Sequence, residues 1–325
     1  MDSNSSSTDH QPVEYSTRQW VLLFFKGLLM GAADVVPGVS GGTIAFITGI
    51  YARLINALKA LHPLTLQIWF EQGFIAFWRA IDGRFLLTLF SGIIVSILSL
   101  AQLIQYALEH YAIPLWSFFF GLVLASVIYL IKQIPRWRWQ EVLAIVLGTV
   151  VALMISVLRP AELPAEWWML MFAGAIAICA MILPGISGSF ILLLMGMYSV
   201  FIEALGNLDI VLLASFAIGC IVGLIAFSHL LSFLMQRYLS VVLAVLTGFL
   251  IGSLNVLWPW KQALETTINR HGEVIPLVQT NISPAYYNVL ALQSGENLAQ
   301  LSTSITVAVI GFTMVFLMEW FVGDE

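Results

Sequence analysis

Long apolar runs dominate the chain, and polar residues are concentrated in the first 17 residues and in short intervals between the runs. A membrane-spanning helix needs about 20 mostly apolar residues. Six runs of this kind lie near 85–108, 115–132, 140–158, 210–235, 239–258 and 301–322. The alternating ten-residue segments typical of a transmembrane β-barrel do not occur. The pattern predicts an all-α integral membrane protein.

Two further apolar segments, 18–58 and 167–205, are each interrupted near the centre by the same short motif. The motifs read Pro37-Gly38-Val39-Ser40-Gly41 and Pro184-Gly185-Ile186-Ser187-Gly188. The two segments align on these prolines without a gap, from Trp20 over Trp167 to Leu58 over Leu205. Proline cannot continue a helix, and glycine lets the chain turn. Each segment is therefore predicted to be a broken helical hairpin of the re-entrant type.

The duplication divides the chain into two halves, each a broken hairpin followed by three spans. A hairpin returns to its own side of the membrane, and three spans then reverse the side. The second half must start from the opposite face, which makes the chain an inverted-topology repeat. The predicted units are a disordered cytoplasmic tail at 1–17, a first repeat at 18–158 and a second repeat at 159–325. The first repeat contains an amphipathic interfacial segment at 60–84, and the second contains a polar outer loop at 259–300.

Composition and charge placement refine this picture. Hydrophobic residues make up 60% of the chain and charged residues 10%, compared with about 25% charged residues in a soluble domain. With a cytoplasmic N-terminus, ten of the 13 Lys and Arg residues fall on the cytoplasmic side, as the positive-inside rule requires. Both termini are then cytoplasmic. The two cysteines lie in apolar runs, so no disulfide or metal site is expected. No cofactor and no nucleic-acid partner are expected either.

The duplicated motif is the strongest candidate for a binding site. A helix that restarts after a break presents unpaired N–H groups and the positive end of its dipole, which suit an anion. Ser40 and Ser187 are expected to be N-caps of these restarting helices. The candidate phosphate-binding residues at the two breaks are Pro37, Gly38, Ser40, Gly41, Gly42, Thr43, Pro184, Gly185, Ser187, Gly188 and Ser189. The alternative is that the glycines serve close helix packing.

Three charged residues of the first copy are further candidates. Asp34 lies deep in an apolar run, where an ionisable residue is expensive and is a functional candidate. It is either a proton or cation coupling site, together with Lys26 eight residues earlier on nearly the same helical face, or a structural partner for Lys26 or a freed backbone donor. Its counterpart in the second copy is Met181. Arg53 is either a positive-inside anchor or a contact to a phosphate headgroup.

The stretch Lys26-Gly27-Leu28-Leu29-Met30-Gly31-Ala32-Ala33-Asp34-Val35-Val36-Pro37-Gly38-Val39-Ser40-Gly41-Gly42-Thr43-Ile44-Ala45 resembles a known family, as does Met181-Ile182-Leu183-Pro184-Gly185-Ile186-Ser187-Gly188-Ser189. Both are similar to the PopT-type bacterial polyprenyl-phosphate transporters, formerly a family of unknown function. The resemblance implies movement of undecaprenyl phosphate across the cytoplasmic membrane, from outer to inner leaflet, to recycle the lipid carrier for cell-wall and surface-polymer synthesis. Family members often have Glu where this chain has Ala52, so no role for that acid is carried over.

Two other functions use the same residues differently. A small-anion transporter or channel would need the same cradle at the breaks without a slot for a lipid tail. A phosphatase acting on polyprenyl diphosphate would need a nucleophile with a nearby base or acid. No histidine lies near either motif, and Asp34 alone is a thin catalytic set. We therefore expect a transporter and not an enzyme. The sequence predicts no oligomeric state.

Overall fold

The computed structural model describes residues 16–36, 39–158, 163–268, 274–294 and 298–323, and these are mostly helical. Six helices are long and apolar enough to cross a membrane, and each coincides with one of the predicted runs. They are α6 (Gly83–His110), α7 (Ala112–Gln133), α8 (Trp139–Val157), α12 (Ile210–Arg237), α13 (Leu239–Leu257) and α15 (Leu301–Gly323). The expectation of a multi-pass helical membrane protein is confirmed at this level.

The two broken segments fold into similar short-helix arrangements. The first consists of α1 (Thr17–Val35), α2 (Gly41–Ile47) and α3 (Tyr51–Lys59), and the second of α9 (Trp167–Ile182), α10 (Gly188–Leu194) and α11 (Met197–Gly206). Each segment also bends a second time after its Pro-Gly motif. The helix direction changes by 118° between α2 and α3 and by 108° between α10 and α11. The returning arm of each hairpin is therefore itself bent.

The second bend rests on a glycine in the left-handed region in each copy. Gly49 has φ +73° and Gly196 has φ +66°, a conformation that glycine adopts at little steric cost. A tyrosine follows two residues later in both copies, at Tyr51 and Tyr198. The repeated Gly-x-Tyr is the sequence signal for this bend, which the proline-centred interpretation did not predict.

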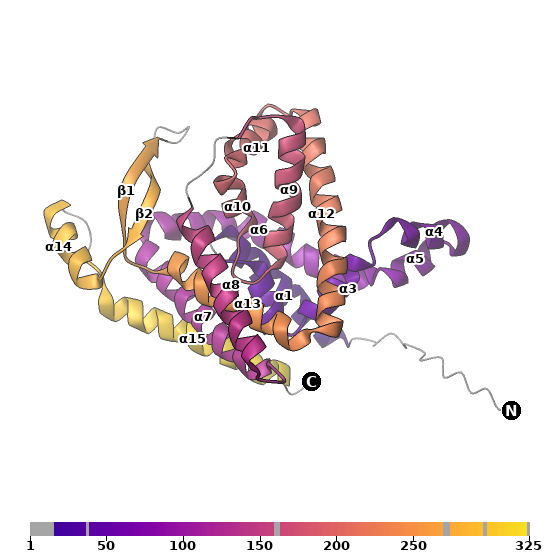
Figure 1. Ribbon diagram of the computed structural model, residues 1–325, viewed down its shortest axis with the longest axis horizontal. Coiled ribbons are helices and arrows are strands. Elements are labelled where there is room, and N and C mark those ends of the chain that lie inside the picture. The colour runs from indigo at the N-terminus through magenta and orange to yellow at the C-terminus, as the bar shows by residue number, and fades with distance from the viewer. Residues whose placement is uncertain (1–15, 37–38, 159–162, 269–273, 295–297, 324–325) are drawn as a thin grey trace.

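Two segments lie outside the long helices. The predicted interfacial segment forms α4 (Pro63–Gln72) and α5 (Phe74–Ala80), which project from one side of the molecule (Figure 1) and expose Trp69, Phe70 and Phe74. The predicted outer loop contains an antiparallel hairpin, β1 (Lys261–Ile268) and β2 (Val274–Asn281), followed by α14 (Pro284–Ser294). The sequence pattern indicated only a polar loop there.

The long helices pack in pairs. α1 lies along α6 and α9 along α12, while α8 lies along α13 and α15 along α7; α7 and α13 also pack on each other. In Figure 1, α9, α10, α11 and α12 form one group, and β1, β2 and α14 lie on the opposite side. Glycines allow the close approaches: Gly27 faces the backbone of α6, and Gly148 faces that of α13. Such small-residue contacts are typical of helix association in membranes.

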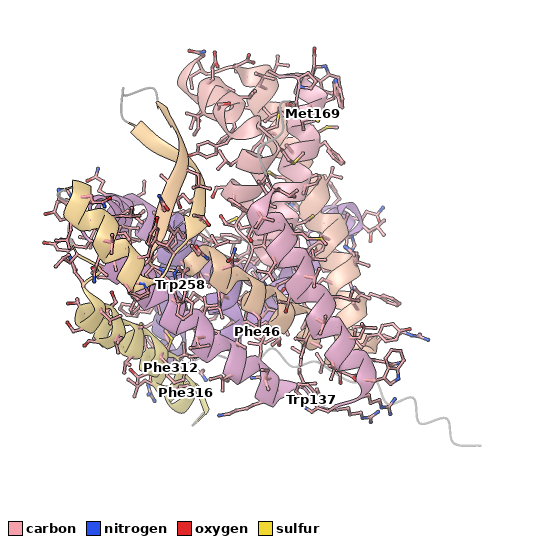
Figure 2. All side chains as sticks on the ribbon, turned by 60° about the vertical axis from the view of Figure 1, so that its left-hand side comes forward. Phe46, Trp137, Met169, Trp258, Phe312 and Phe316 are labelled. Carbon is pink, nitrogen blue, oxygen red and sulfur yellow. The ribbon has the colours of Figure 1, made fainter. Side chains whose placement is uncertain are left out.

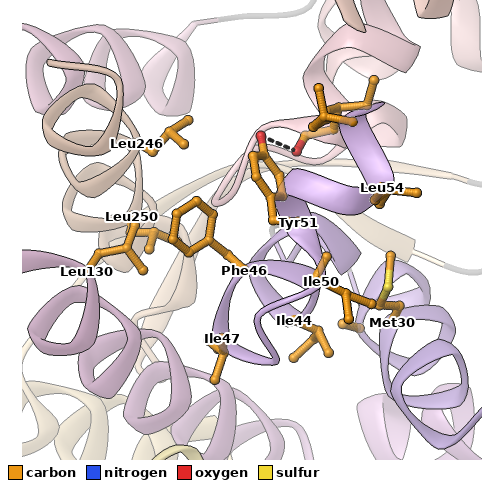
Figure 3. Packing of buried hydrophobic residues seen from close by; sticks show 14 of the residues in the cluster. Met30, Ile44, Phe46, Ile47, Ile50, Tyr51, Leu54, Leu130, Leu246 and Leu250 are labelled. Carbon is orange, nitrogen blue, oxygen red and sulfur yellow. Dashed lines mark hydrogen bonds between the residues drawn. The ribbon is translucent and has the colours of Figure 1, made fainter. Parts of the chain in front are cut away.

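The core centres on the first broken hairpin. All seven residues of α2 are buried. Figure 3 shows Phe46 of α2 packed toward Leu130 of α7 and Leu250 of α13. Figure 2 shows Met169 near the top of the molecule and Trp137 near the bottom, with Phe46 between them. Helix α2, which follows the first break, is thereby held deep inside the protein by α7 and α13.

Candidate functional site

Helix α2 is held at both ends by charged side chains of α1. Asp34 Oδ1 accepts a 2.7 Å hydrogen bond from the N–H of Gly41, at the start of α2. Lys26 Nζ donates a 3.0 Å hydrogen bond to the carbonyl of Thr48, at the end of α2. An acid at a helix N-terminus and a base at its C-terminus both complement the helix dipole. The sequence left two structural partners open for Asp34, namely Lys26 and a freed backbone N–H. In the structure its carboxylate accepts from a backbone N–H.

Ser40 completes the cap of α2. Its Oγ accepts a 3.1 Å hydrogen bond from the N–H of Gly42, as expected for an N-cap. The N–H groups of Gly41 and Gly42 are therefore occupied by Asp34 and Ser40. These two N–H groups at the start of α2 therefore already have hydrogen-bond acceptors within the protein.

The structure brings the two breaks together through hydrogen bonds. Because α9 ends at Ile182, just before Pro184, the carbonyls of its last residues have no helical N–H partners. Ser40 Oγ donates to Met181 O at 2.9 Å. Tyr51 Oη donates to Ile182 O at 3.2 Å, the dashed contact in Figure 3. The motifs are 147 residues apart in sequence, and the first copy satisfies the backbone that the second copy exposes.

A third bond joins the copies in the reverse direction. The N–H of Gly185, which has φ +84°, donates to Thr43 Oγ1 at 3.2 Å. Thr43 is 1% exposed and Gly185 is partly buried, so this contact is largely shielded from water. A buried backbone donor without an acceptor costs about 1–3 kcal/mol. Thr43 thus stabilises the turn of the second copy.

The second break is tied down less firmly than the first. Ser187 occupies the N-cap position of α10, yet among the described residues no side chain caps this helix. Ser187 Oγ instead lies 2.9 Å from Ser189 Oγ. Met181 stands where the first copy has Asp34 and cannot accept a hydrogen bond of that kind. The expected cap is present at Ser40 and absent at Ser187, because Ser187 pairs with a neighbouring hydroxyl.

The glycines of the motifs lie against protein atoms. A Cβ at Gly42 would be 2.5 Å from Ile182 O, and one at Gly188 would be 2.8 Å from Ala177 O. A Cβ at Gly41 would be 2.6 Å from Asp34 Oδ2. Real Cβ atoms do not approach oxygen this closely, so these positions require glycine for packing. Of the two roles considered for the glycines, close backbone packing is the one visible in these contacts.

The remaining candidates are more peripheral. Arg53 forms a two-pronged ion pair with Asp82, at 2.6 Å from Nε and 3.1 Å from Nη2, and its guanidinium lies over the Phe85 ring. The pair is about one-third exposed, where such contacts add little stability. Pro37 and Gly38 lie outside the described residues.

A small pocket lies beside the second break, between α8, the α9–α10 connection and α13. Its polar lining comes from Ser187, Ser156 and Ser253, and its apolar lining includes Ile155, Phe190 and Val256. Ser156 and Ser253 were not among the candidates, because neither belongs to the duplicated motif. Only the packing of α8 and α13 brings them to the break.

The sequence is similar to a protein family and to individual relatives from other bacteria. A family model described as VCA0040-like, undecaprenyl phosphate translocase-like, matches residues 30–275. A polyprenyl-phosphate transporter of Vibrio cholerae is 47% identical over 285 residues, which cover 88% of this chain and 92% of that protein. A polyprenyl-phosphate transporter of Staphylococcus aureus is 28% identical over 259 residues, 74% of this chain and 87% of that protein. No solved structure matches.

Proposed function

We propose that this chain, which belongs to the undecaprenyl phosphate translocase-like family, carries a polyprenyl phosphate such as undecaprenyl phosphate across the bacterial cytoplasmic membrane. The proposed direction is from the outer to the inner leaflet, which returns the lipid carrier for cell-wall and surface-polymer synthesis. The relatives named as polyprenyl-phosphate transporters support the substrate. The observation that carries the proposal is the meeting of two duplicated breaks inside an apolar helical protein.

The proposed architecture is an inverted repeat of 18–158 and 159–325. Support comes from matched helix contacts in the two halves. Gly121 of α7 abuts Ala308 O of α15, and Gly248 of α13 abuts Ile145 O of α8. The packing of α1 on α6 is likewise matched by that of α9 on α12. Equivalent contacts between equivalent helices are what a duplicated unit would give.

The proposed topology has both termini and the α4–α5 segment in the cytoplasm and the β1–β2 hairpin outside. We expect a cysteine at Ala80 and a cysteine at Gln279 to react with a membrane-impermeant maleimide from opposite faces. Both positions are exposed, and Cys179 and Cys220 would first be replaced by serine. The charge split of ten to three motivates this orientation. Labelling of both cysteines from one face would contradict the inverted repeat.

The proposed phosphate site is the junction of the two breaks. It would use Ser40, Thr43, Ser187 and Ser189 with the glycine turns around them. A break buried in the protein is the arrangement by which transporters place polar backbone groups at membrane depth. Asp34 and Lys26 are the proposed coupling residues, and Arg53 is a proposed headgroup contact at the cytoplasmic mouth.

The function can be tested in proteoliposomes with undecaprenyl phosphate in one leaflet. We expect the protein to accelerate appearance of the phosphate in the other leaflet, read by a membrane-impermeant phosphatase, compared with empty vesicles. Inorganic phosphate and chloride fluxes are measured in the same vesicles. Anion flux without lipid movement would favour the small-anion alternative, and release of phosphate from undecaprenyl diphosphate would favour an enzyme.

A further inference from the structure

Helices α4 and α5 expose large apolar side chains that the rest of the described protein does not cover. Phe70 is 85% exposed and Ile75 is 68% exposed, and Leu64, Trp69 and Phe74 are exposed as well. No residue of α5 is buried. A contiguous stretch of exposed apolar residues marks a surface that meets a membrane or another protein.

Ring contacts hold α4 and α5 together as one helical pair. The Trp69 ring of α4 lies 5.8 Å from the Phe74 ring and 5.6 Å from the Phe77 ring of α5, between centroids. Aromatic contacts of this kind stabilise beyond the area that they bury. The two helices join at Gly73, which has φ +86°. The exposed residues therefore belong to one packed unit, the α4–α5 pair.

The α4–α5 pair is fixed next to the start of a membrane span. α5 ends at Ala80 and the candidate span α6 begins at Gly83, so the link has two residues and reaches only about 3.3–3.6 Å per residue. Asp82 of the link pairs with Arg53 of α3, and the Trp78 ring packs against Gly83. The pair must therefore lie close to the level at which α6 enters the membrane.

The length of the two helices excludes a transmembrane arrangement. α4 has ten residues and α5 has seven, which gives about 15 Å and 10 Å of helix, while the hydrocarbon core is about 30 Å thick. The pair projects from one side of the molecule (Figure 1). On α6, Leu87 is exposed one turn after the helix begins, and Phe90 and Ile94 follow. The apolar residues of the pair thus continue directly into the lipid-facing surface of a span.

Two exposed arginines stand on either side of the junction between α5 and α6. They are Arg79 and Arg84, and the exposed acid of the pair is Glu71. Asp82, which lies between the arginines, is neutralised by its ion pair with Arg53. Tryptophan and phenylalanine next to arginine are typical of helices that lie in the membrane interface. Arginines at this level can extend toward lipid phosphates while their stems stay on apolar surface.

We infer that the α4–α5 pair is an in-plane docking surface for an anionic phospholipid leaflet. Leu64, Trp69, Phe70, Phe74 and Ile75 enter the boundary between headgroups and acyl chains, and Arg79 and Arg84 contact the lipid phosphates. In the proposed topology this is the cytoplasmic leaflet, where anionic lipids attract basic residues. The inference goes beyond the proposed function and does not rest on the transported lipid, since it concerns a surface outside the junction of the two breaks.

The first test places a fluorescent label at Phe70→Cys in the full chain, with Cys179 and Cys220 replaced by serine. The protein is held in nanodiscs of phosphatidylglycerol and phosphatidylcholine that contain one copy each. We expect blue-shifted emission that is lost to a lipid carrying a nitroxide near the top of its acyl chain and is shielded from iodide. Arg136→Cys is the matched control, an exposed loop residue between α7 and α8, and its label should be quenched by iodide instead.

Two outcomes would overturn the docking surface. Iodide quenching of the Phe70 label equal to that of the Arg136 label would mean that the pair stands in water. Shielding from both quenchers, confined to nanodiscs that hold two copies, would make a second copy of the chain the occupant. Neither result bears on movement of polyprenyl phosphate, which is measured separately in proteoliposomes.

The second test concerns the charges. Quenching of the Phe70 label by nitroxide-labelled phosphatidylglycerol is compared with quenching by nitroxide-labelled phosphatidylcholine. We expect the anionic lipid to be enriched beside the parent, by up to roughly fivefold for each arginine. Arg79→Gln with Arg84→Gln should remove this enrichment, while the two lysine replacements and the control Arg138→Gln should keep it. The same enrichment in the parent and in the double glutamine variant would refute the headgroup contact.

Discussion

Replacement of Gly42 by valine is expected to slow transport strongly while leaving the protein in the membrane. A Cβ at this position would lie 2.5 Å from Ile182 O of the other copy, so the two breaks must separate. Their separation strains the Ser40 contact to Met181 and the Thr43 contact to Gly185. Overpacking of this kind costs about 1–3 kcal/mol, which corresponds to roughly 5- to 150-fold when it falls on one transport state.

The measurement is the initial rate of undecaprenyl phosphate movement in proteoliposomes at matched protein content. Gly188→Val should also slow transport, but by crowding within the second copy, since a Cβ there would meet Ala177 O of α9 at 2.8 Å. Gly206→Val is the matched control, because no atom lies within 4 Å of a Cβ at the end of α11. Full activity of Gly42→Val would show that contact between the breaks is dispensable, and full activity of Gly188→Val would show the same for the packing of α10 on α9.

Asp34→Asn is expected to keep the fold but to remove the pH dependence of net transport. Asparagine retains an acceptor oxygen for the N–H of Gly41, so the cap of α2 survives. It cannot exchange a proton, and the coupling proposed for Asp34 requires that exchange. The measurement is the rate of lipid-phosphate movement across a series of pH values, with and without a pH gradient. A pH profile identical to that of the parent would make Asp34 a helix cap and nothing more.

Asp34→Ala tests the capping role of Asp34 separately from its proposed coupling role. Alanine leaves the buried N–H of Gly41 without its acceptor, which costs about 1–3 kcal/mol. We expect a lower thermal unfolding temperature for Asp34→Ala than for Asp34→Asn in detergent. Met181→Ala is the matched control at the equivalent position of the second copy, where no such acceptor is lost. Equal unfolding temperatures of Asp34→Ala and Asp34→Asn would contradict the capping role.

The family and the helical framework could be read from the sequence because they depend on local properties. Six spans follow from run length and hydrophobicity, and each appears as a helix. The break at Pro184 follows from the missing N–H of proline, whichever segment lies opposite. The capping of α2 by Ser40 is likewise local, since Ser40 accepts a hydrogen bond from the N–H of Gly42, two residues later. The resemblance in the duplicated motifs led to the family that the comparison supports.

The candidate site was predicted in position but not in contacts. Ser40 and Ser187 look equivalent in sequence, yet Ser40 caps its helix and reaches across to Met181 O, while Ser187 pairs with Ser189. Asp34 could have paired with Lys26 on the same helix; in the structure its carboxylate accepts from Gly41, and Lys26 reaches Thr48. These choices depend on how α2 lies against α1, which no spacing along the chain specifies.

By itself, then, the sequence determined where the helices run, where they break and that the break is repeated, because each depends on neighbouring residues. Only the tertiary structure decided which groups fill the breaks. The freed carbonyls of Met181 and Ile182 are satisfied by side chains more than 130 residues away, and Ser156 of α8 and Ser253 of α13 are brought to the second break by helix packing. A buried polar group must find a partner, but the partner is whichever segment the packing of the whole chain brings opposite it.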